Sequence, residues 1–412
     1  MRLSHLHIRH FRSLYDVTLE LKPLTILIGP NASGKSNVLK ALRFLHDAVA
    51  GDRLEWQAYD SGISDLVWYG TDEAGNRPTI IEFACSFTSL QGYPVGRYRT
   101  VFHCDEYIAV KSEQLEVALS SNSTELNPFL YREGSSVEVH IGRRGGLLRR
   151  PYRTKAQSSR MLSLREEGPD LQVFSARSIY EHIRGWRFFD VIPSKARGAS
   201  FIPPYPEEVP PLANDASNLS AFLYALWRLQ PEDFDMIAEY LSDMVGFPQN
   251  LLVEHDADRG GRNARYALIE TPFGEEHPIP PESLSDGTIR LLAHLALLLG
   301  DRSVSLAYLE EPDRGLHPRL MLHLADIIRQ AVAPISSEEE LGMPSPQVII
   351  ATHSPEFLDC FDLEKERDHL QVYIVEREEA GKTIFIPATA EEFKPWLEKY
   401  RLGEAVRRRF VP

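Results

Sequence analysis

The chain has 412 residues, 43% of them apolar, which is enough to bury a sizeable core and excludes an intrinsically disordered protein. Acidic side chains outnumber basic ones by 59 to 45, and the net charge of −14 excludes a protein that binds nucleic acid through overall positive charge. Cys85, Cys104 and Cys360 are too widely spaced for a disulfide framework or a zinc site, and no segment reads as a secretion signal or a membrane span. We therefore expect a cytoplasmic protein.

The first 50 residues predict a strand hairpin, a buried strand and a helix. Apolar side chains recur in residues 3–11 and, at a period of two, in residues 17–21, which is typical of strands. Residues 24–28 form a short apolar run of strand type. Residues 35–46 then place Val38, Leu39, Leu42 and Leu45 on one face of a helix.

The segment between this strand and this helix reads Gly-Pro-Asn-Ala-Ser-Gly-Lys-Ser, and its spacing matches a Walker A phosphate-binding loop. Backbone N–H groups held by the two glycines would point at phosphate oxygens, the lysine would reach the β and γ phosphates, and the final serine would ligate Mg²⁺. The alternative is a fortuitous glycine turn. The predicted nucleotide-binding residues are Gly29, Pro30, Asn31, Ala32, Ser33, Gly34, Lys35, Ser36 and Asn37.

Residues 51–212 predict a β-rich insertion that ends in a proline-rich linker. Strand-like runs at 80–87, 98–103, 116–119 and 137–141 are separated by turn residues, which favours an antiparallel arrangement. A basic stretch at 143–155 is either a solvated hairpin or a phosphate-binding loop. Six prolines within 193–213 cannot donate ladder hydrogen bonds, so a linker or a draped loop is expected there.

Residues 213–280 predict a helical subdomain. Apolar stripes indicate a pair of helices, at 219–227 and 231–244.

Residues 281–412 carry three further motifs. Ser285 and Gly287 open an apolar helix, where they form either an anion site or an ordinary helix cap. The strand at 305–309 is followed by Glu310, placed to hold Mg²⁺, and Glu311, placed to polarise the water that attacks the γ phosphate; the alternative is a solvated acidic strand end. His353 ends another apolar strand, where it would contact the γ phosphate or serve a structural role.

In this order the motifs resemble the ABC-type ATPase head of RecF, SMC and OLD-family proteins. Further likenesses are Phe11-Arg-Ser-Leu, Asp215-Ala-Ser-Asn-Leu, Leu284-Ser-Asp-Gly-Thr-Ile-Arg-Leu-Leu, Glu310-Glu-Pro-Asp-Arg-Gly-Leu-His-Pro, Thr352-His-Ser-Pro and the segment at 396–404. The resemblance implies an α/β fold: an ABC-type P-loop ATPase head, split between residues 1–50 and 281–412, with an antiparallel β insertion and a helical subdomain.

The resemblance also implies roles for the site residues. Two heads would dimerise, so that ATP and Mg²⁺ bound by one copy meet Ser285 and Gly287 of the other. Lys35 and Glu311 would be catalytic, Glu311 as the base, and His353 would be the switch histidine. The metal-side acid, commonly Asp in this family, is Glu310 here. Neither Gln57 nor Gln91 is a persuasive Q-loop glutamine, so that role stays empty.

Three functions follow as hypotheses. The first is an ATP-driven dimerising switch that acts on DNA or on a separate effector protein, in DNA maintenance or in defence against phage. The second is an ATP-binding scaffold with almost no turnover. The third, an importer or exporter ATPase, is disfavoured by the large β-rich insertion. Residues 354–412 are too short for the Toprim nuclease domain of the OLD group, and Asp-x-Asp pairs at 233–235 and 256–258 are interpreted as solvated surface. We therefore expect no nuclease activity.

Overall fold

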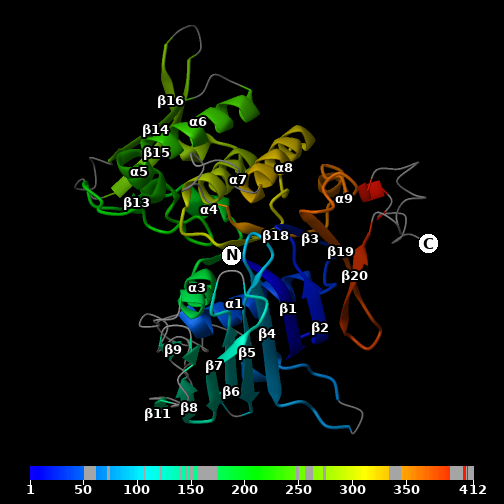
Figure 1. The fold of residues 1–412 in the computed structure, drawn as a ribbon. Helices are drawn as coiled ribbons and strands as arrows, with labels where there is room; N and C mark the ends of the chain where they lie inside the picture. Colours follow the sequence, from blue (N-terminus) through cyan, green and yellow to red (C-terminus); the bar gives the residue numbers. More distant parts are fainter. Residues whose placement is uncertain are drawn as a thin grey trace. The chain divides into compact units, whose positions relative to one another are not determined.

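The computed structural model describes residues 1–50, 62–71, 75–105, 107–120, 123–139, 142–143, 146–147, 152–155, 174–246, 250–255, 263–271, 275–333, 345–389, 402–404 and 406. They form two compact units, each with its own core (Figure 1). The first unit contains residues 1–186 and 370–388, and the second contains residues 187–369 and 389–412. Within the described ranges, no helix is both long and apolar enough to cross a membrane.

An antiparallel sheet of eight strands forms one layer of the first unit (Figure 1). The strands lie in the order β11-β8-β7-β6-β5-β4-β1-β2. Their bounds are β1 (Arg2–Phe11), β2 (Leu14–Glu20), β4 (Ile80–Thr88), β5 (Pro94–Cys104), β6 (Ile108–Val117), β7 (Asn127–Glu133), β8 (Ser136–Val139) and β11 (Tyr152–Lys155). Short strands β9 (Gly142–Arg143) and β10 (Gly146–Leu147) pair separately, and a 3₁₀ turn spans Ile63–Asp65. Buried and accessible side chains alternate along much of β2 and β5, because successive side chains of a strand point to opposite faces.

Helix α1 (Lys35–Ala50) packs against this sheet through aromatic rings. The Phe44 ring lies 5.1 Å from that of Phe102 and 5.7 Å from that of Phe83, measured between ring centroids. Phe11 at the end of β1 joins the same cluster, 5.8 Å from Phe44. Helix α3 (Phe174–Arg184) contacts both α1 and β5. These contacts fix the helix that follows the predicted phosphate loop.

A second set of strands in the first unit holds the strand that precedes the loop. Strand β3 (Leu24–Ile28), whose five residues are all buried, pairs in parallel with β19 (Leu370–Arg377), and β19 pairs antiparallel with β20 (Thr383–Ala388). Residues 370–388 are thereby brought to the loop from the far end of the sequence.

The second unit combines helices with short strands. Its helices are α4 (Pro193–Ala196), α5 (Leu219–Leu229), α6 (Pro231–Val245), α7 (Asp286–Leu295), α8 (Pro318–Val332) and α9 (Pro355–Leu358), with a 3₁₀ turn at Pro281–Ser283 and a π-helical turn at Ala296–Gly300 that extends α7. Its strands are β13 (Ser200–Phe201), β14 (Asn250–His255), β15 (Asn263–Glu270), β16 (His277–Ile279), β17 (Leu306–Glu310) and β18 (Gln347–Thr352), and β12 (Trp186–Phe189) spans the junction of the units. Strands β17 and β18 pair in parallel, and β13, β14 and β16 each pair antiparallel with β15.

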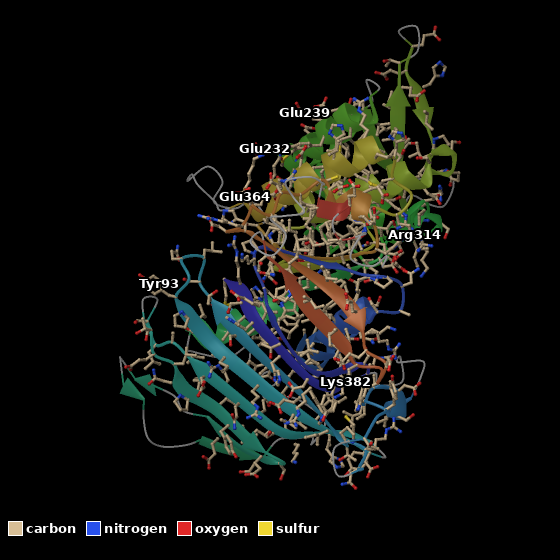
Figure 2. All side chains as sticks on the ribbon, turned by 90° about the vertical axis from the view of Figure 1, so that its right-hand side faces the viewer. Tyr93, Glu232, Glu239, Arg314, Glu364 and Lys382 are labelled. Carbon is tan, nitrogen blue, oxygen red and sulfur yellow. The ribbon has the colours of Figure 1, made fainter. Side chains whose placement is uncertain are left out.

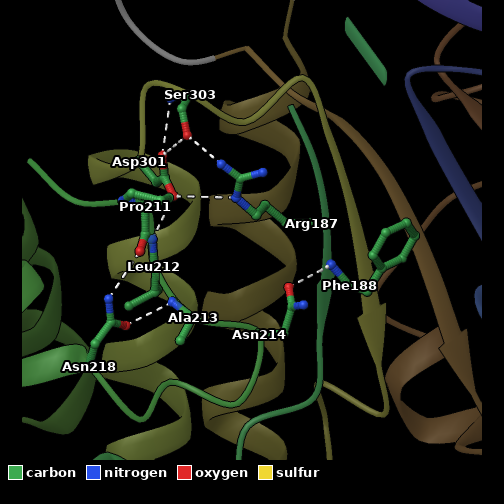
Figure 3. A network of polar contacts seen from close by, with 9 residues as sticks. All are labelled: Arg187, Phe188, Pro211, Leu212, Ala213, Asn214, Asn218, Asp301 and Ser303. Atoms are coloured by element: carbon green, nitrogen blue, oxygen red, sulfur yellow. Dashed lines mark hydrogen bonds and ion pairs between the residues drawn. The ribbon is translucent and has the colours of Figure 1, made fainter. Parts of the chain in front are cut away.

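Polar contacts tie the segment before α5 to β12 and to the end of α7 (Figure 3). Asn218 accepts a hydrogen bond from the backbone of residue 213 at 2.7 Å and donates one to the carbonyl of residue 211. The buried Asp301 accepts from the backbone N–H of Leu212 at 3.0 Å and from the Ser303 hydroxyl at 2.6 Å. Asn214 accepts from the N–H of Phe188. The Asp215-Ala-Ser-Asn-Leu motif therefore belongs to a segment that is held in place by side-chain contacts to backbone groups.

Most of the predicted elements are confirmed, and four details are corrected. The antiparallel insertion contains two strands outside the predicted strand runs, β7 and β11, and its strands continue the sheet of β1 and β2. The strand predicted at 116–119 is the end of the longer β6. The proline-rich segment contains α4 and β13, because Pro193 occupies the first helical turn, where its missing N–H is not needed. The helical subdomain also contains β14, β15 and β16. The four-part division of the chain stays a prediction.

The prediction that the Asp-x-Asp pair at 233–235 is solvated surface is wrong for Asp233. The Asp233 side chain is buried, and it accepts two hydrogen bonds from the Arg302 guanidinium, at 2.9 and 3.0 Å. A two-pronged contact of this kind compensates for burial of the carboxylate. Asp235 is exposed as predicted. The pair at 256–258 lies outside the described residues.

His294 in α7 predicts an acid-dependent loss of stability. Its ring is buried, Nδ1 lies 2.6 Å from the carbonyl oxygen of Arg290, and burial lowers its pKa to about 4. The unfolded chain, with a histidine pKa of about 6.5, takes up the proton first on acidification. The contribution of His294 is thus complete above about pH 6.5 and is lost as the pH falls towards 4, by roughly 3 kcal/mol.

Urea unfolding at pH 7.5 and pH 5 checks this expectation. His294→Leu should have a smaller difference in unfolding free energy between the two pH values than the wild type. His103→Leu, at an exposed histidine, should leave that difference unchanged. An equal pH dependence in His294→Leu and the wild type would contradict the assignment.

Candidate functional site

The predicted phosphate loop lies between β3 and α1 in the first unit. Lys35, the first residue of α1, is buried, and its amine donates to the carbonyl oxygens of Gly29 at 2.7 Å and Pro30 at 2.9 Å. The lysine charge is therefore held inside the loop by the loop's own backbone. The buried Ser33 hydroxyl has no hydrogen-bond partner among the described residues, so the loop retains a donor for a bound phosphate oxygen.

The two glycines of the loop permit close backbone packing. A Cβ atom at Gly29 would lie 2.2 Å from the Val375 carbonyl oxygen in β19. At Gly34 it would lie 2.0 Å from the hydroxyl of Thr383 in β20, and Gly34 also has a φ of +109°, which L side chains rarely adopt. Glycine is therefore required at both positions. Ala32 also has a positive φ, of 64°, but it lies with Pro30 and Asn31 in the exposed part of the loop.

A chain of hydrogen bonds supports the loop from behind. The Thr383 hydroxyl donates to the carbonyl oxygen of Ser33 at 3.0 Å and lies 2.6 Å from the Ser13 hydroxyl. The side-chain amide of Asn37 donates to Ser13 at 2.6 Å. Ser13 belongs to the Phe11-Arg-Ser-Leu likeness, but no signal in the sequence pointed to Thr383. Direct contacts of Asn37 and Ser36 with nucleotide and metal stay predictions.

The paired acids lie at the end of β17 in the second unit. Glu310 is opposite Ala351 of the parallel strand β18, and the Glu311 N–H donates to the Ala351 carbonyl oxygen at 2.8 Å. Glu311 has a φ of 44°, in a region that a residue other than glycine rarely occupies. Its carboxylate oxygen lies 2.9 Å from His353 Nδ1. The structure thus brings Glu311 and His353 together, from the ends of neighbouring strands.

Two neighbours reinforce this pair. The Thr352 hydroxyl donates to the buried Asp313 at 2.8 Å, and burial raises the pKa of the Asp313 carboxyl. Arg314 is exposed (Figure 2), and its guanidinium lies 3.9 Å from the Glu311 carboxylate, which is a weak surface ion pair. The loop that follows β17 and the end of β18 are thus joined by two side-chain contacts, Glu311 with His353 and Asp313 with Thr352.

The segment predicted to bind a partner's γ phosphate starts α7. Ser285 is the N-cap residue: its hydroxyl accepts from the Thr288 N–H at 3.1 Å, as the helix-cap alternative predicted. Gly287 is buried, and a Cβ there would lie 3.0 Å from the carbonyl oxygen of Gly315. Arg197, which the sequence did not reveal, donates to the Leu284 carbonyl oxygen and to the Asp286 carboxylate.

The predicted residues fall into two groups. Residues 29–37 belong to the first unit, and Ser285, Gly287, Glu310, Glu311 and His353 belong to the second. In the part of the chain that the structure describes, no three His, Cys, Asp or Glu side chains are arranged to hold a metal ion. Mg²⁺ that arrives with a nucleotide needs no such cluster, because phosphates and water supply most of its oxygen ligands. The Ser36 hydroxyl and the Glu310 carboxylate are donors of the type that Mg²⁺ prefers.

Two family models match the chain. The model described as "AAA ATPase domain" matches residues 1–127, which include the phosphate loop. The model described as "AAA domain, putative AbiEii toxin, Type IV TA system" matches residues 158–359, which include the α7 cap, the paired acids and His353.

Individual proteins are similar as well. The DNA replication and repair protein RecF of Limosilactobacillus reuteri is 25% identical over 209 residues, 45% of this chain and 55% of that protein. The OLD nuclease of Thermus scotoductus is 44% identical over 50 residues, 12% of this chain and 9% of that protein. A crystal structure of the SmcHead bound to the C-winged helix domain of ScpA has a TM-score of 0.54 at 16% identity and covers 96% of this chain and 100% of that chain.

The chain is a P-loop ATPase that is similar in sequence to RecF and similar in fold to an SMC head. The expected fold class is confirmed. The ATPase spans less than two thirds of the length of either curated relative named above. Gln57 and most of the segment at 396–404 lie outside the described residues, as do the side chains of the basic stretch at 143–155.

Proposed function

We propose that the ATPase binds and hydrolyses ATP with Mg²⁺ between two copies of the chain and so acts as a conformational switch. The contact between Glu311 and His353 carries this proposal. A carboxylate at a strand end, held 2.9 Å from an imidazole on a backbone of positive φ, is costly to build and is typical of functional sites. A carboxylate used only for solubility needs none of these constraints.

Each group in the loop and at the strand ends has a defined task in this mechanism. Lys35 supplies positive charge to the β and γ phosphates in exchange for its present carbonyl partners. Glu311 orients the attacking water and accepts its proton, while His353 holds the carboxylate in place. Ser36 and Glu310 are the proposed ligands of Mg²⁺, which when bound neutralises charge on the phosphate oxygens.

The dimer part of the proposal concerns α7. Its N-terminal N–H groups and the exposed Ser285 hydroxyl are suited to bind an anion, and Gly287 allows α7 to pack closely against the Gly315 carbonyl. Arg197, directly after α4, restrains this segment through its bonds to the Leu284 carbonyl and the Asp286 carboxylate. The closed dimer is favoured to the extent that it binds ATP better than the open state does.

The biological setting is proposed from the relatives. RecF is named for DNA replication and repair, the SMC head is bound to a protein partner, and one matching family is described as a toxin of a toxin–antitoxin system. We therefore propose a cytoplasmic protein that acts on DNA or on a separate effector protein, in DNA maintenance or antiphage defence.

Phosphate release from Mg-ATP by the wild type and by Lys35→Ala tests this function. The wild type should release phosphate, and DNA should change the rate if DNA is the partner. Lys35→Ala should be inactive, because the charge at the β and γ phosphates is lost. Lys365→Ala, at an exposed lysine, is the matched control and should behave like the wild type. No release by the wild type under any of these conditions would leave the ATP-binding scaffold as the function.

A further inference from the structure

The second unit contains an aromatic pocket that has no part in the proposed ATPase chemistry. It has a volume of about 310 Å³ and lies between the segment around residues 204–205, the end of α5 and strand β14. This volume is at the lower end of the range for small-ligand sites, about 300–1,000 Å³. None of its lining residues belongs to the phosphate loop, the α7 cap or the acidic pair.

Aromatic rings form the walls of the pocket. Tyr205 and Trp227 are exposed, by 80% and 42%, although large aromatic side chains are usually buried. Tyr224 is buried beside them, 5.8 Å from the Trp227 ring, and its hydroxyl donates to the Pro204 carbonyl oxygen at 3.0 Å. The His255 ring packs edge-on against Tyr224, 4.4 Å away. The exposed rings of Tyr205 and Trp227 therefore lie beside a buried Tyr224 that is held by contacts to Pro204 and His255.

Two charged side chains, Arg228 and Glu254, also line the aromatic pocket. The Arg228 guanidinium lies 5.7 Å from the Tyr205 ring centroid and 5.5 Å from that of Trp227, within cation–π range of both. Both Arg228 and Glu254 are exposed. The pocket thus offers flat apolar faces, a cation and a carboxylate acceptor within one small site.

We propose that the aromatic pocket binds an unpaired nucleobase of a nucleic-acid single strand. The rings of Tyr205 and Trp227 present faces on which a base can stack, Arg228 pairs with the adjoining phosphate, and Glu254 accepts a hydrogen bond from an exocyclic amino group. Stacking aromatics beside cationic side chains are the common means of holding single strands. The inference does not depend on the proposed switch.

Fluorescence anisotropy with a labelled single-stranded DNA of about ten nucleotides tests the proposal. The test uses the full chain carrying Lys35→Ala, so that the phosphate loop does not contribute. Tyr205→Ala and Trp227→Ala should each weaken binding roughly 5- to 150-fold. Tyr205→Phe, which keeps the ring, should bind like its parent, and so should Tyr93→Ala, at an exposed tyrosine of the first unit (Figure 2). Arg228→Gln should reduce the salt slope by about 0.7.

Other results would overturn the proposal. Unchanged affinity in both alanine variants would place the strand elsewhere on the protein. Equal affinity for the single strand and for a duplex of the same sequence would exclude recognition of an unpaired base. If AMP displaced the DNA at a concentration similar to that of the DNA itself, the ligand of the pocket would be a free mononucleotide. Binding of a proline-rich peptide but not of DNA would assign the pocket to a protein partner. All of these outcomes leave phosphate release by the wild type unaffected, so a failure here is distinct from a failure of the switch.

Discussion

Replacing Glu311 by Gln is expected to lower ATP hydrolysis by about 10²- to 10⁴-fold while ATP binding is retained. The amide has nearly the same shape as the carboxylate, but it cannot take the proton of the attacking water. Because closure depends on bound ATP and opening depends on its hydrolysis, Glu311→Gln should accumulate as a dimer in Mg-ATP. Phosphate release measures the rate of ATP hydrolysis, and light scattering measures the mass of the protein with and without nucleotide.

Glu239→Gln is the matched control, since Glu239 is an exposed acid in α6 (Figure 2). It should have the turnover and the mass of the wild type. If Glu311→Gln and the wild type release phosphate at the same rate, Glu311 is not the base. If neither turns over and the mass does not respond to ATP, the scaffold hypothesis is favoured and the roles of Ser285 and Gly287 across a dimer are void.

The second large effect is expected from Gly34→Ala. The added Cβ would lie 2.0 Å from the Thr383 hydroxyl, and the residue would have to keep a φ of +109°. Strain of this kind costs about 1–3 kcal/mol, and displacement of Thr383 removes its hydrogen bond to Ser33. We therefore expect ATP affinity to fall at least about 100-fold, a loss equivalent to two or more hydrogen bonds to a charged group.

Titration with a fluorescent ATP analogue measures the affinity, and thermal unfolding measures the accompanying loss of stability. Gly92→Ala separates strain from collision, because Gly92 has a φ of +88° but no atom within 4 Å of the added Cβ. It should lose some stability and bind ATP normally. Normal ATP binding by Gly34→Ala would show that the loop does not grip phosphate in the predicted manner.

The sequence predicted those parts of the molecule whose residues are neighbours along the chain. The loop at 29–36, the strand before it and the helix after it follow from local spacing and period. The sequence predicted that Glu311 and His353 each follow an apolar strand, but it did not predict that the two side chains are in contact. The pairing of those strands in parallel, which sets the 2.9 Å contact, comes from the tertiary fold.

The remaining parts depend on partners that lie far away in sequence. Thr383 supports Ser33 from 350 residues further on, and Arg197 reaches Leu284 across 87 residues. A threonine in an ordinary strand carries no local mark of such a role. Strands β14 and β15 were missed because short apolar runs do not distinguish strand from helix, and the helices before them favoured the helical interpretation.

The pairing of β3 with β19 has a consequence for how the protein is made. The strand that carries the phosphate loop emerges early during synthesis, but its parallel partner and the Thr383 support follow only after residues 187–369, which belong to the second unit. The buried strand β3 can pair with β19 only after that late segment has been synthesised, and such long-range pairings form slowly. On the ribosome, the nucleotide-binding loop is therefore among the first parts to be synthesised and among the last to be completed.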